Sequence, residues 1–424
     1  MEEKIYAMWL SDALGPGNSA GKILIEKYGS FTEIHKLKET DYAQAGVKPG
    51  SSIMQRLMDK NTAKSEKDFG FCNYNYFDVI EYTAQSYPKR LKSIMNPPTV
   101  LYTRGRMIDI DDNVCIGIVG TRSYTDIGWN SVYRVAGGIA KSGAVVVTGL
   151  ASGIDTAATR AALEGSGYAI GIIGGGIERI YPSENKELFE TMYRCGLVIS
   201  ELSPFSNITG TYFPIRNRII SGLCQGVLVG EGNIKSGAMI TAKHAAEQGR
   251  HIFAIPGDIN SEESSGVNKL IKEGAIPVFE SSDVLEKYRY LYPHRIKNIK
   301  NADNLQASEV RSSKKVRLFS KTPQKTAGTK ETKNTVSGAY IPRENIPQTP
   351  ENQTKASEKQ IRQLPDYLCE TEKKVYSVLS DVTDKNTDTI SVEAGISTDK
   401  VLSALTTLEI EGLIVKTGTG VLKI

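Results

Sequence analysis

The chain has 424 residues, more than one ordinary domain, which predicts two or three domains. A hydrophobic content of 40% is enough for a packed core, and the net charge of +4 has meaning only once it is divided along the chain. No basic segment followed by an apolar run opens the sequence, and no apolar stretch reaches the length of a membrane span. We therefore expect a cytoplasmic protein that does not interact with a membrane.

Cysteine and histidine spacing argues against a metal centre. The five cysteines are scattered without a CxxC pair, and the four histidines form no ligand pattern. Free thiols in a reducing compartment explain an odd, scattered set better than disulfides or zinc do. The sequence therefore predicts neither a metal nor a cofactor.

Residues 1–68 are expected to form a small helical domain of the helix-hairpin-helix or SAM-like type. The turn Leu14-Gly15-Pro16-Gly17 lies between two helical patterns and resembles the hairpin of such modules, whose backbone amides often hold a DNA phosphate. Many small helical domains carry the same turn without binding DNA. Both interpretations stay open.

The next segment, residues 69–105, is dense in aromatic residues. Its rings include Phe69, Phe71, Tyr74, Tyr76, Phe77, Tyr82 and Tyr87. Such rings can stack on nucleic-acid bases, but more often they pack one domain against another, and we favour packing. Residues 99–102 predict an edge strand, where the neighbouring prolines would be tolerated.

Five apolar, largely β-branched runs between residues 114 and 257 each lead to a turn of small residues. The turns comprise residues 120–122, 149–155, 174–176, 231–237 and 256–258. Continuous apolar strands separated by helical patterns predict an α/β fold with a parallel sheet of at least six strands, over residues 69–290. The turns would then meet at the carboxyl edge of the sheet, where open α/β sheets bind ligands.

A basic linker is expected over residues 291–365. Between residues 294 and 365 there are 15 lysines and arginines against 6 aspartates and glutamates, and the segment is rich in Ser, Thr, Pro, Asn and Gln. This composition is typical of a disordered segment. It is either a solvated tether or a source of non-specific attraction to nucleic acid.

Residues 366–424 predict three helices followed by a β-hairpin, the order of a winged helix. The third helix, residues 397–411, would read DNA in a usual winged helix. Here it holds Lys400 as its only basic residue against Asp399, Glu409 and Glu411. Because groove binding needs basic side chains against phosphates, we expect this module to contact protein.

The turn Gly120-Thr121-Arg122 combines a backbone amide, a hydroxyl and a guanidinium, which suits a phosphate. It has neither the GxGxxG spacing of dinucleotide binders nor the GxxxxGK[ST] spacing of nucleotide hydrolases. Arg216 and Arg218 flank Asn217 at the start of a later helix. They would bind phosphate in the same crevice or pair with carboxylates such as Asp155, Glu201 or Glu231.

Two further motifs suit a nucleic acid. Ser236 and Gly237 begin a helix, which is either an anion-accepting start or an ordinary N-cap. Arg179 and Tyr181 follow a triple glycine, and a guanidinium beside a stacking ring suits a single strand. There is no Ser/His/Asp or Cys/His arrangement, so Glu201 and Glu231 are the only carboxylates considered for catalysis.

These motifs, in this order, resemble the DNA-processing protein A (DprA, also called Smf) family. The resemblance covers about residues 87–287. Its matching segments are GTR (120–122), TGLASGID (148–155), YPSEN (181–185), SEL (200–202), FPIRNRIISGL (213–223), SGAMITA (236–242) and AIPGD (254–258).

The resemblance implies an extended Rossmann-like core between the helical domain and the winged helix. It implies a non-enzymatic recombination mediator that binds single-stranded DNA, loads the RecA recombinase onto it in natural transformation, and forms a homodimer through the core. No residue is expected to be catalytic. The expected nucleic-acid-binding residues are Gly120, Thr121, Arg122, Ser152, Gly153, Gly174, Gly175, Gly176, Arg179, Tyr181, Asn185, Arg216, Asn217, Arg218, Ser236 and Gly237.

This chain departs from the family's usual pattern at two places. Ser152 stands where the family usually has arginine, and Ala158-Thr159 stands where Ala-His is usual. Loss of that arginine would weaken the pocket or shift contacts to Arg179 and Arg216.

A nucleoside monophosphate hydrolase is the alternative hypothesis. Related Rossmann-like proteins cleave nucleoside monophosphates with an Arg and a Glu at strand ends, and Arg218 with Glu231 would fill those roles. That family requires a PGGxGTxxE helix start. The segment Ser236-Gly237-Ala238-Met239-Ile240-Thr241 lacks both the proline-glycine pair and the glutamate, so we favour the binding protein.

Overall fold

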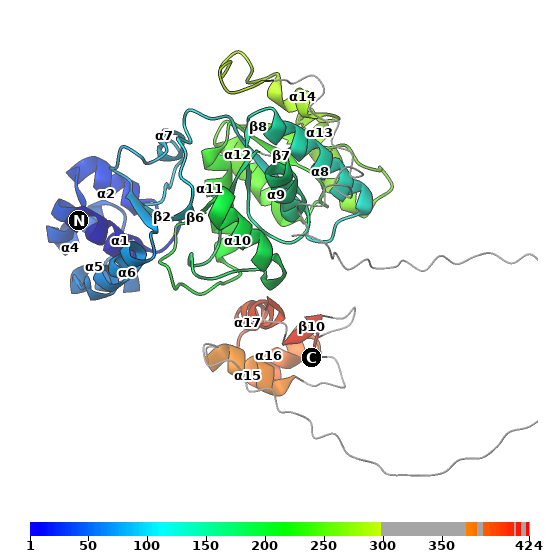
Figure 1. Ribbon diagram of the computed structural model, residues 1–424. Helices are drawn as coiled ribbons and strands as arrows, with labels where there is room; N and C mark the ends of the chain where they lie inside the picture. Colours follow the sequence, from blue (N-terminus) through cyan, green and yellow to red (C-terminus); the bar gives the residue numbers. More distant parts are fainter. Residues whose placement is uncertain (166, 298–369, 380–384, 411–412, 417–420, 424) are drawn as a thin grey trace, which may run out of the picture. The chain divides into compact units, whose positions relative to one another are not determined.

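A computed structural model describes residues 1–165, 167–297, 370–379, 385–410, 413–416 and 421–423 (Figure 1). The chain divides into two compact units, Met1–Lys314 and Lys315–Ile424. The greater part of the predicted linker, residues 298–365, lies outside the described residues. No helix of the described segments is long and apolar enough to cross a bilayer.

Helices account for the start of the first unit. They are α1 (Glu2–Leu14), α2 (Ala20–Tyr28), α3 (Phe31–Lys36), α4 (Glu39–Gln44), α5 (Ser52–Asp59) and α6 (Ala63–Tyr74). Serine side chains cap two of them: Ser30 accepts from the Glu33 amide and Ser51 from the Met54 amide, both at 3.2 Å. Leu24 and Phe31 are fully buried between these helices. Helix α6 runs through residue 68, where the sequence predicted a domain boundary.

One nine-stranded sheet forms the centre of the first unit, in the order β1-β2-β6-β5-β4-β3-β7-β8-β9. The strands are β1 (Asp78–Glu81), β2 (Val100–Gly105), β3 (Cys115–Val119), β4 (Val145–Thr148), β5 (Tyr168–Ile173), β6 (Leu197–Ser200), β7 (Gly226–Val229), β8 (His251–Ala254) and β9 (Ile276–Pro277). From β6 to β9 all neighbours pair in parallel, whereas β2 is antiparallel to both β6 and β1. The result is a mixed, mostly parallel sheet.

The predicted edge strand at residues 99–102 is not an edge. Strand β2 lies between β1 and β6, and it pairs with both through registers such as Tyr102 with Val79 and with Ser200. Pro97 and Pro98 precede the strand rather than interrupt it, so every amide of β2 is available for pairing. The antiparallel strands β1 and β2 therefore extend the sheet beyond the parallel strands, of which the sequence predicted at least six.

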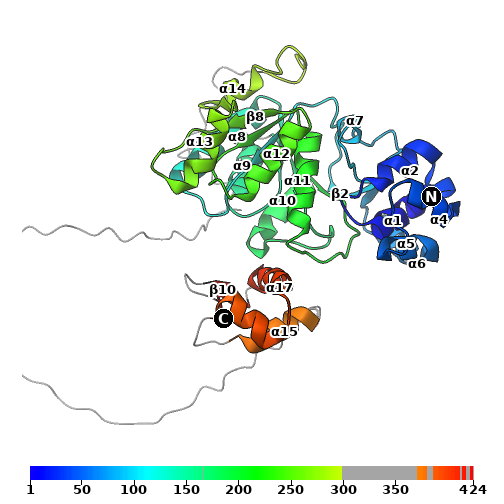
Figure 2. The ribbon, with the colours of Figure 1, turned by 180° about the vertical axis from the view of Figure 1, so that it is seen from behind.

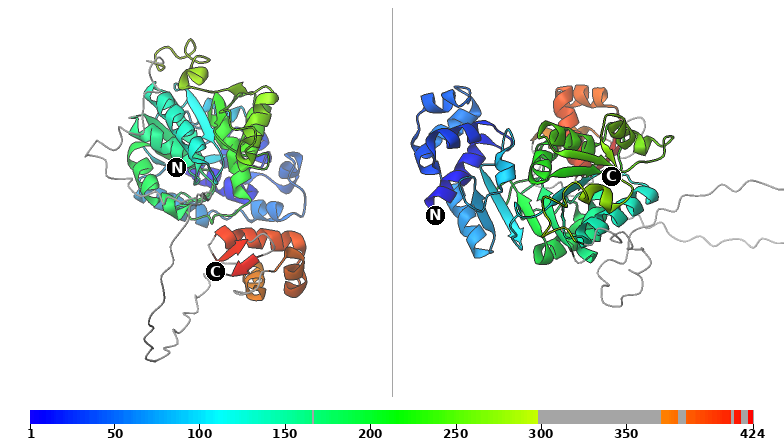
Figure 3. Two further views of the ribbon diagram at one scale, coloured as in Figure 1. Left: turned by 90° about the vertical axis from the view of Figure 1, so that its right-hand side faces the viewer. Right: turned by 90° about the horizontal axis from the view of Figure 1, so that it is seen from above.

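Helices cover both faces of the sheet (Figure 2, Figure 3). They are α7 (Lys89–Lys92), α8 (Asp126–Lys141), α9 (Ile154–Glu164), α10 (Lys186–Cys195), α11 (Tyr212–Leu223), α12 (Gly237–Glu247), α13 (Ser265–Lys272) and α14 (Ser281–Leu285). Successive strand residues enter opposite cores: Val145 and Val147 pack with residues of α11 and α12, and Val146 packs with residues of α8 and α9. Burial on both faces explains the continuous apolar runs.

The first unit continues past the predicted boundary at residue 290. Ile296 is buried in the core, the Arg295 guanidinium pairs with Asp112, and the Lys297 amide donates to the Ser142 carbonyl at 2.9 Å. Residues 291–297 therefore belong to the packed core and not to the linker.

The second unit contains α15 (Glu370–Val378), α16 (Thr387–Ala394) and α17 (Thr398–Ile410), followed by β10 (Ile414–Lys416) and β11 (Val421–Lys423). The two strands pair antiparallel. Val375, Ile390, Val401 and Leu408 are fully buried between the three helices and make a separate small core.

Replacing Phe253 on β8 should destabilise the first unit strongly. Its ring is fully buried, so Phe253→Ala leaves a cavity and should lower the free energy of unfolding by about 3–5 kcal/mol. Phe279 is 65% exposed, and Phe279→Ala should change stability by no more than about 0.5 kcal/mol. Urea denaturation of both variants measures the difference, and similar losses would contradict the burial of Phe253 and the exposure of Phe279.

Candidate nucleic-acid interface

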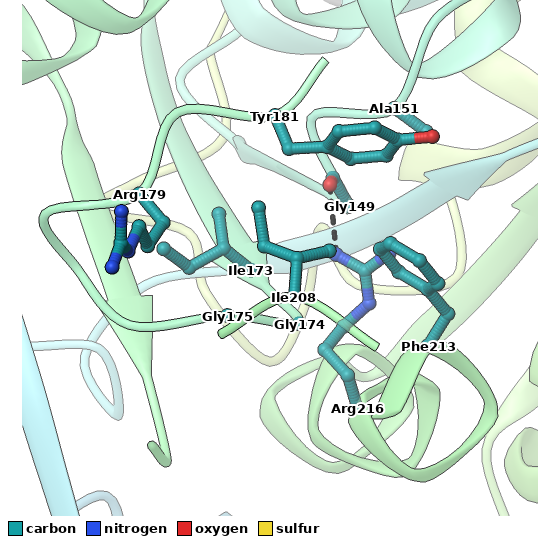
Figure 4. A pocket seen from close by; sticks show the side chains of 10 residues that line it. All are labelled: Gly149, Ala151, Ile173, Gly174, Gly175, Arg179, Tyr181, Ile208, Phe213 and Arg216. Atoms are coloured by element: carbon teal, nitrogen blue, oxygen red, sulfur yellow. Dashed lines mark hydrogen bonds between the residues drawn. The ribbon is translucent and has the colours of Figure 1, made fainter. Parts of the chain in front are cut away.

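Two adjoining cavities lie at the carboxyl ends of β3, β4, β5 and β7. They share Ala151, Phe213 and Arg216, and we call them together the groove. The larger cavity has a volume of about 410 Å³ and lies between the Gly120–Ser123 turn and the start of α12. The smaller is a narrow slot lined by Gly149, Gly174, Gly175, Ile208, Arg179 and Tyr181, among others (Figure 4). The turns at these strand ends therefore meet at one edge of the sheet.

Glycine is required where the Gly120-Thr121-Arg122 turn packs on the start of α9. A Cβ on Gly120 would lie 2.6 Å from Ile154, and Gly153 has a φ of +84° with the Thr121 carbonyl directly against it. The Ile154 amide donates to that carbonyl at 3.2 Å, and the Thr121 amide donates to the Glu231 carbonyl at 2.7 Å. The turn is therefore held firmly from two sides, which fixes the direction in which Arg122 leaves the backbone.

Phe213 lies where the charged and aromatic side chains of the groove converge. Its ring centroid is 5.2 Å from the Arg122 guanidinium, 5.8 Å from that of Arg216 and 5.6 Å from the Tyr181 ring. Arg122 is exposed, whereas Phe213 and Tyr181 are half-buried. Phe213 was quoted as part of the FPIRNR motif but was not predicted as a site residue. Its position one helical turn before Arg216 could have indicated that the two side chains lie on the same face.

Arg216 forms part of the floor of the groove (Figure 4). It is 7% exposed, and its Nη1 donates to the carbonyls of Gly149, at 2.7 Å, and Ile172. Burial lowers the pKa of the Arg216 guanidinium to about 10, against the opposing effect of Asp155, so the side chain stays charged at neutral pH. Burial also raises the pKa of Asp155, which accepts from the Gly149 amide at 2.8 Å.

The rim of the groove carries two further exposed cations. Arg179 donates to Asn207 at 3.5 Å, and Lys235 lines the larger cavity directly before α12. Ser236 accepts from the Ala238 amide at 3.3 Å as the N-cap of α12, and Asn217 donates to the Gly237 carbonyl at 3.5 Å. Lys235 was not predicted, although it adjoins the predicted Ser236-Gly237 pair.

Comparison with known proteins identifies the family to which this chain belongs. The model of the DNA recombination-mediator protein A family matches residues 78–289. The DNA processing protein DprA of Bacillus subtilis is 42% identical over 210 residues, which are 50% of this chain and 71% of that protein. This chain belongs to the DNA recombination-mediator protein A family.

Two comparisons with Streptococcus pneumoniae agree with this placement. Its DNA processing protein DprA is 37% identical over 246 residues, which are 58% of this chain and 85% of that protein. The X-ray structure of DprA from the same species matches with a TM-score of 0.59 at 34% identity, covering 67% of this chain and 97% of that one.

In this DprA family member, five predicted site residues do not line the groove: Ser152, Gly153, Gly176, Asn185 and Arg218. Asn185 is buried and donates to the Leu150 carbonyl at 3.1 Å and to Thr156 at 2.9 Å, so it holds the loop after β4 from behind. Gly176 is buried, and its amide donates a hydrogen bond to the Ser206 carbonyl. Gly153 supports the turn at Thr121, and Ser152 is half-buried next to the lining residue Ala151.

Arg218 points away from the groove, contrary to the prediction. It is 2% exposed, and its Nη2 lies 2.5 Å from Oε1 of Glu201. Residues two apart on a helix are separated by about 200° around its axis, so Arg216 and Arg218 cannot face the same side of α11. The helical period alone contained this information.

The glycine turn of the N-terminal helices meets this ion pair. The Gly17 amide donates to Glu201 at 3.2 Å, and the Gly17 carbonyl accepts from Asn96 at 2.8 Å. A Cβ on Gly17 would lie 2.8 Å from Ile215. The turn therefore joins the helices to the sheet core, the structural one of the two interpretations that the sequence left open.

The two candidate catalytic carboxylates are both engaged elsewhere. Glu231 is buried and accepts from the amide and hydroxyl of Thr125, at 2.8 and 2.6 Å, where Thr125 caps α8. Glu201 is held by Arg218 and Gly17. Neither lines the groove, so Arg218 and Glu231 do not form the pair that the hydrolase hypothesis requires. Among the described residues, no three His, Cys, Asp or Glu side chains are grouped to hold a metal ion.

Removing Arg218 should destabilise the protein without weakening binding in the groove. Arg218→Met leaves Glu201 buried without its counter-charge and should lower the free energy of unfolding by about 3–5 kcal/mol. Combining it with Glu201→Leu removes both charges and should recover part of the loss, because the Gly17 amide then lacks its acceptor. Urea denaturation measures this; a single variant that is as stable as the parent but has lost affinity for single-stranded DNA would contradict the structural role.

Proposed function

We propose that this chain is a non-enzymatic mediator of DNA recombination that binds single-stranded DNA and loads the RecA recombinase onto it during natural transformation. The observation that carries the proposal is the groove, which is lined by four cations, by aromatic rings and by the start of α12. The cations are Arg122, Arg179, Arg216 and Lys235. Membership of the recombination-mediator family also supports this proposed function. Because the proposed function acts on DNA that has entered the cell, we place the protein in the cytoplasm. The family resemblance also implies that it forms a homodimer through the core.

The side chains of the groove suit an unpaired strand better than a duplex. Exposed Arg122 and Lys235 and the N-cap of α12 offer charge and hydrogen-bond donors to phosphates. The rings of Phe213 and Tyr181, 5.6 Å apart, offer surfaces to bases. Only unpaired bases expose their faces for stacking, so phosphate and ring contacts together favour a single strand.

We propose that the second unit is a winged helix that contacts protein. Helix α17 exposes Asp399, Leu402, Ser403, Thr406 and Glu409 on its outer side, and Leu402 is 51% exposed. Acidic side chains repel phosphates and apolar side chains form no favourable contact with them, whereas both kinds are suited to contact with a protein surface. Lys400 is the one basic residue on this helix.

Arg122→Ala should weaken binding of single-stranded DNA by about 10- to 100-fold, because an exposed guanidinium on a firmly held turn loses a charge-assisted phosphate contact. It should also reduce the slope of log affinity against log salt by about 0.7. Fluorescence polarisation with a labelled oligothymidylate over a salt series measures both quantities.

The matched control is Arg194→Ala, which removes the same charge from an exposed position at the end of α10. That end lies at the edge of the sheet opposite the groove, because α10 runs antiparallel to the strands. Equal losses in the two variants would mean that the effect is one of net charge, and the groove would not be the site. Displacement of the oligonucleotide by a nucleoside monophosphate at equal concentration would favour the hydrolase.

Deleting residues 366–424 should leave the affinity for single-stranded DNA within about twofold of the parent, since the groove lies wholly in the first unit and α17 lacks a basic face. The same polarisation titration tests this. A loss comparable to that of Arg122→Ala would show that the second unit binds DNA directly.

A further inference from the structure

Two tyrosines at the end of α6 extend into solvent from an otherwise packed aromatic region. Phe71 and Phe77 pack edge to face with ring centroids 5.9 Å apart, and Phe71 also packs on Phe205, which is distant in the sequence. Tyr74 and Tyr76 are instead 84% and 93% exposed. The predicted packing role therefore accounts for the phenylalanines but not for these tyrosines.

Tyr76 occupies a backbone position that does not favour a ring. Its φ is +57°, in the left-handed region that follows many helices and that glycine or asparagine usually fills. The Phe77 amide closes the turn on the Cys72 carbonyl at 2.9 Å, so the turn itself needs no side chain at residue 76. A strained, exposed ring that adds nothing to packing is a reason to look for a ligand.

A short loop connects these tyrosines to the groove. Ile208 lines the slot, and three residues earlier Phe205 lies against Phe71 with ring centroids 4.5 Å apart. Three residues span at most about 10 Å of chain. Phe205 is 46% exposed, and Asn207 between them accepts from Arg179. The slot, the exposed Phe205 and the end of α6 thus follow one another closely.

The face of α6 that meets this loop continues to the tyrosines. Lys67, Phe71 and Tyr74 are spaced four and three residues apart, which places them on one side of the helix. Lys67 is exposed, but so are Glu66 and Asp78 nearby. Charge is therefore mixed here, and this surface offers rings rather than a positive potential.

We propose that single-stranded DNA leaving the groove past Arg179 and Phe205 stacks unpaired bases on Tyr74 and Tyr76, which form a second contact site on the N-terminal helices. The inference rests on the proposed function and adds to it a longer footprint. Aromatic stacking tolerates any base and does not release counterions. The tyrosine contribution should therefore be independent of salt, unlike that of Arg122.

The test compares the full chain with a Tyr74→Ala/Tyr76→Gly double variant. Oligothymidylates of about 6 and about 16 nucleotides serve as short and long ligands. We expect the double variant to bind the long ligand about 25-fold more weakly at both low and high salt, from roughly fivefold per ring, and to bind the short ligand as the parent does. Its melting temperature should equal or exceed that of the parent, because glycine relieves the strain at residue 76.

Tyr290→Ala is the matched control, since Tyr290 is 80% exposed and follows α14 by five residues in the chain. Helix α14 lies far from α6 in Figure 1. Unchanged long-ligand affinity in the double variant, with Arg122→Ala still impaired, would overturn this inference alone. A lowered melting temperature, or an equal loss with the short ligand, would also overturn it. If the parent chain binds neither oligonucleotide, the proposed function fails, and this extension fails with it.

Discussion

The Arg216 guanidinium holds together the edge of the sheet on which the groove is built. It leaves α11 and donates to the carbonyls of Gly149 and Ile172, where β4 and β5 end, and Asp155 at the start of α9 lies close enough to favour its charge. Desolvating a charge is costly, and carbonyl acceptors with a nearby carboxylate offset that cost. The same contacts fix α11 relative to the strand ends.

The position of α11 determines what each face of that helix contacts. On one face, Phe213 lies three residues before Arg216, so the contacts of Arg216 also determine where the Phe213 ring lies between Arg122 and Tyr181. On the other face, Arg218 binds Glu201, which accepts from Gly17 of the N-terminal helices. One helix therefore supports the groove and attaches the N-terminal helices. Arg216 and Arg218 look equivalent in the sequence, but Arg216 supports the groove and Arg218 contributes to the attachment of the N-terminal helices, on opposite sides of α11.

Much of this arrangement could be predicted from local sequence. Apolar runs gave the parallel strands, and the small residues after them gave the edge at which the groove lies, because those signals depend on a few neighbouring residues. The pairing of β2 with β1 and β6 depends on long-range contacts that no local pattern contains. The partners of Glu201 and Glu231 could not be read from the sequence for the same reason, since Gly17 and Thr125 lie far from them along the chain. The opposite directions of Arg216 and Arg218, in contrast, were available from the helical period.

The aromatic residues illustrate a limit of composition as a signal. Phe71, Tyr74, Tyr76 and Phe77 are neighbours in the sequence, yet the two phenylalanines are packed and the two tyrosines are exposed. Their density alone predicts one role for all four. The backbone angle at Tyr76 separates the two roles, since a ring in a position suited to glycine must be explained by something other than packing.

The serine at residue 152 is consistent with a groove whose cations come from several different elements. Ser152 adds no cation at the position where the family resemblance implies an arginine, and it is half-buried beside the lining residue Ala151. The cations of the groove come instead from separate elements: Arg122 after β3, Arg179 after β5, Lys235 before α12 and Arg216 within α11. Buried Asp155 is the only carboxylate on the lining among the described residues, and burial raises its pKa. Under the proposed function, cations on four separate elements and a single buried acid would let a strand be held at several phosphates, so binding would not depend on an arginine at residue 152.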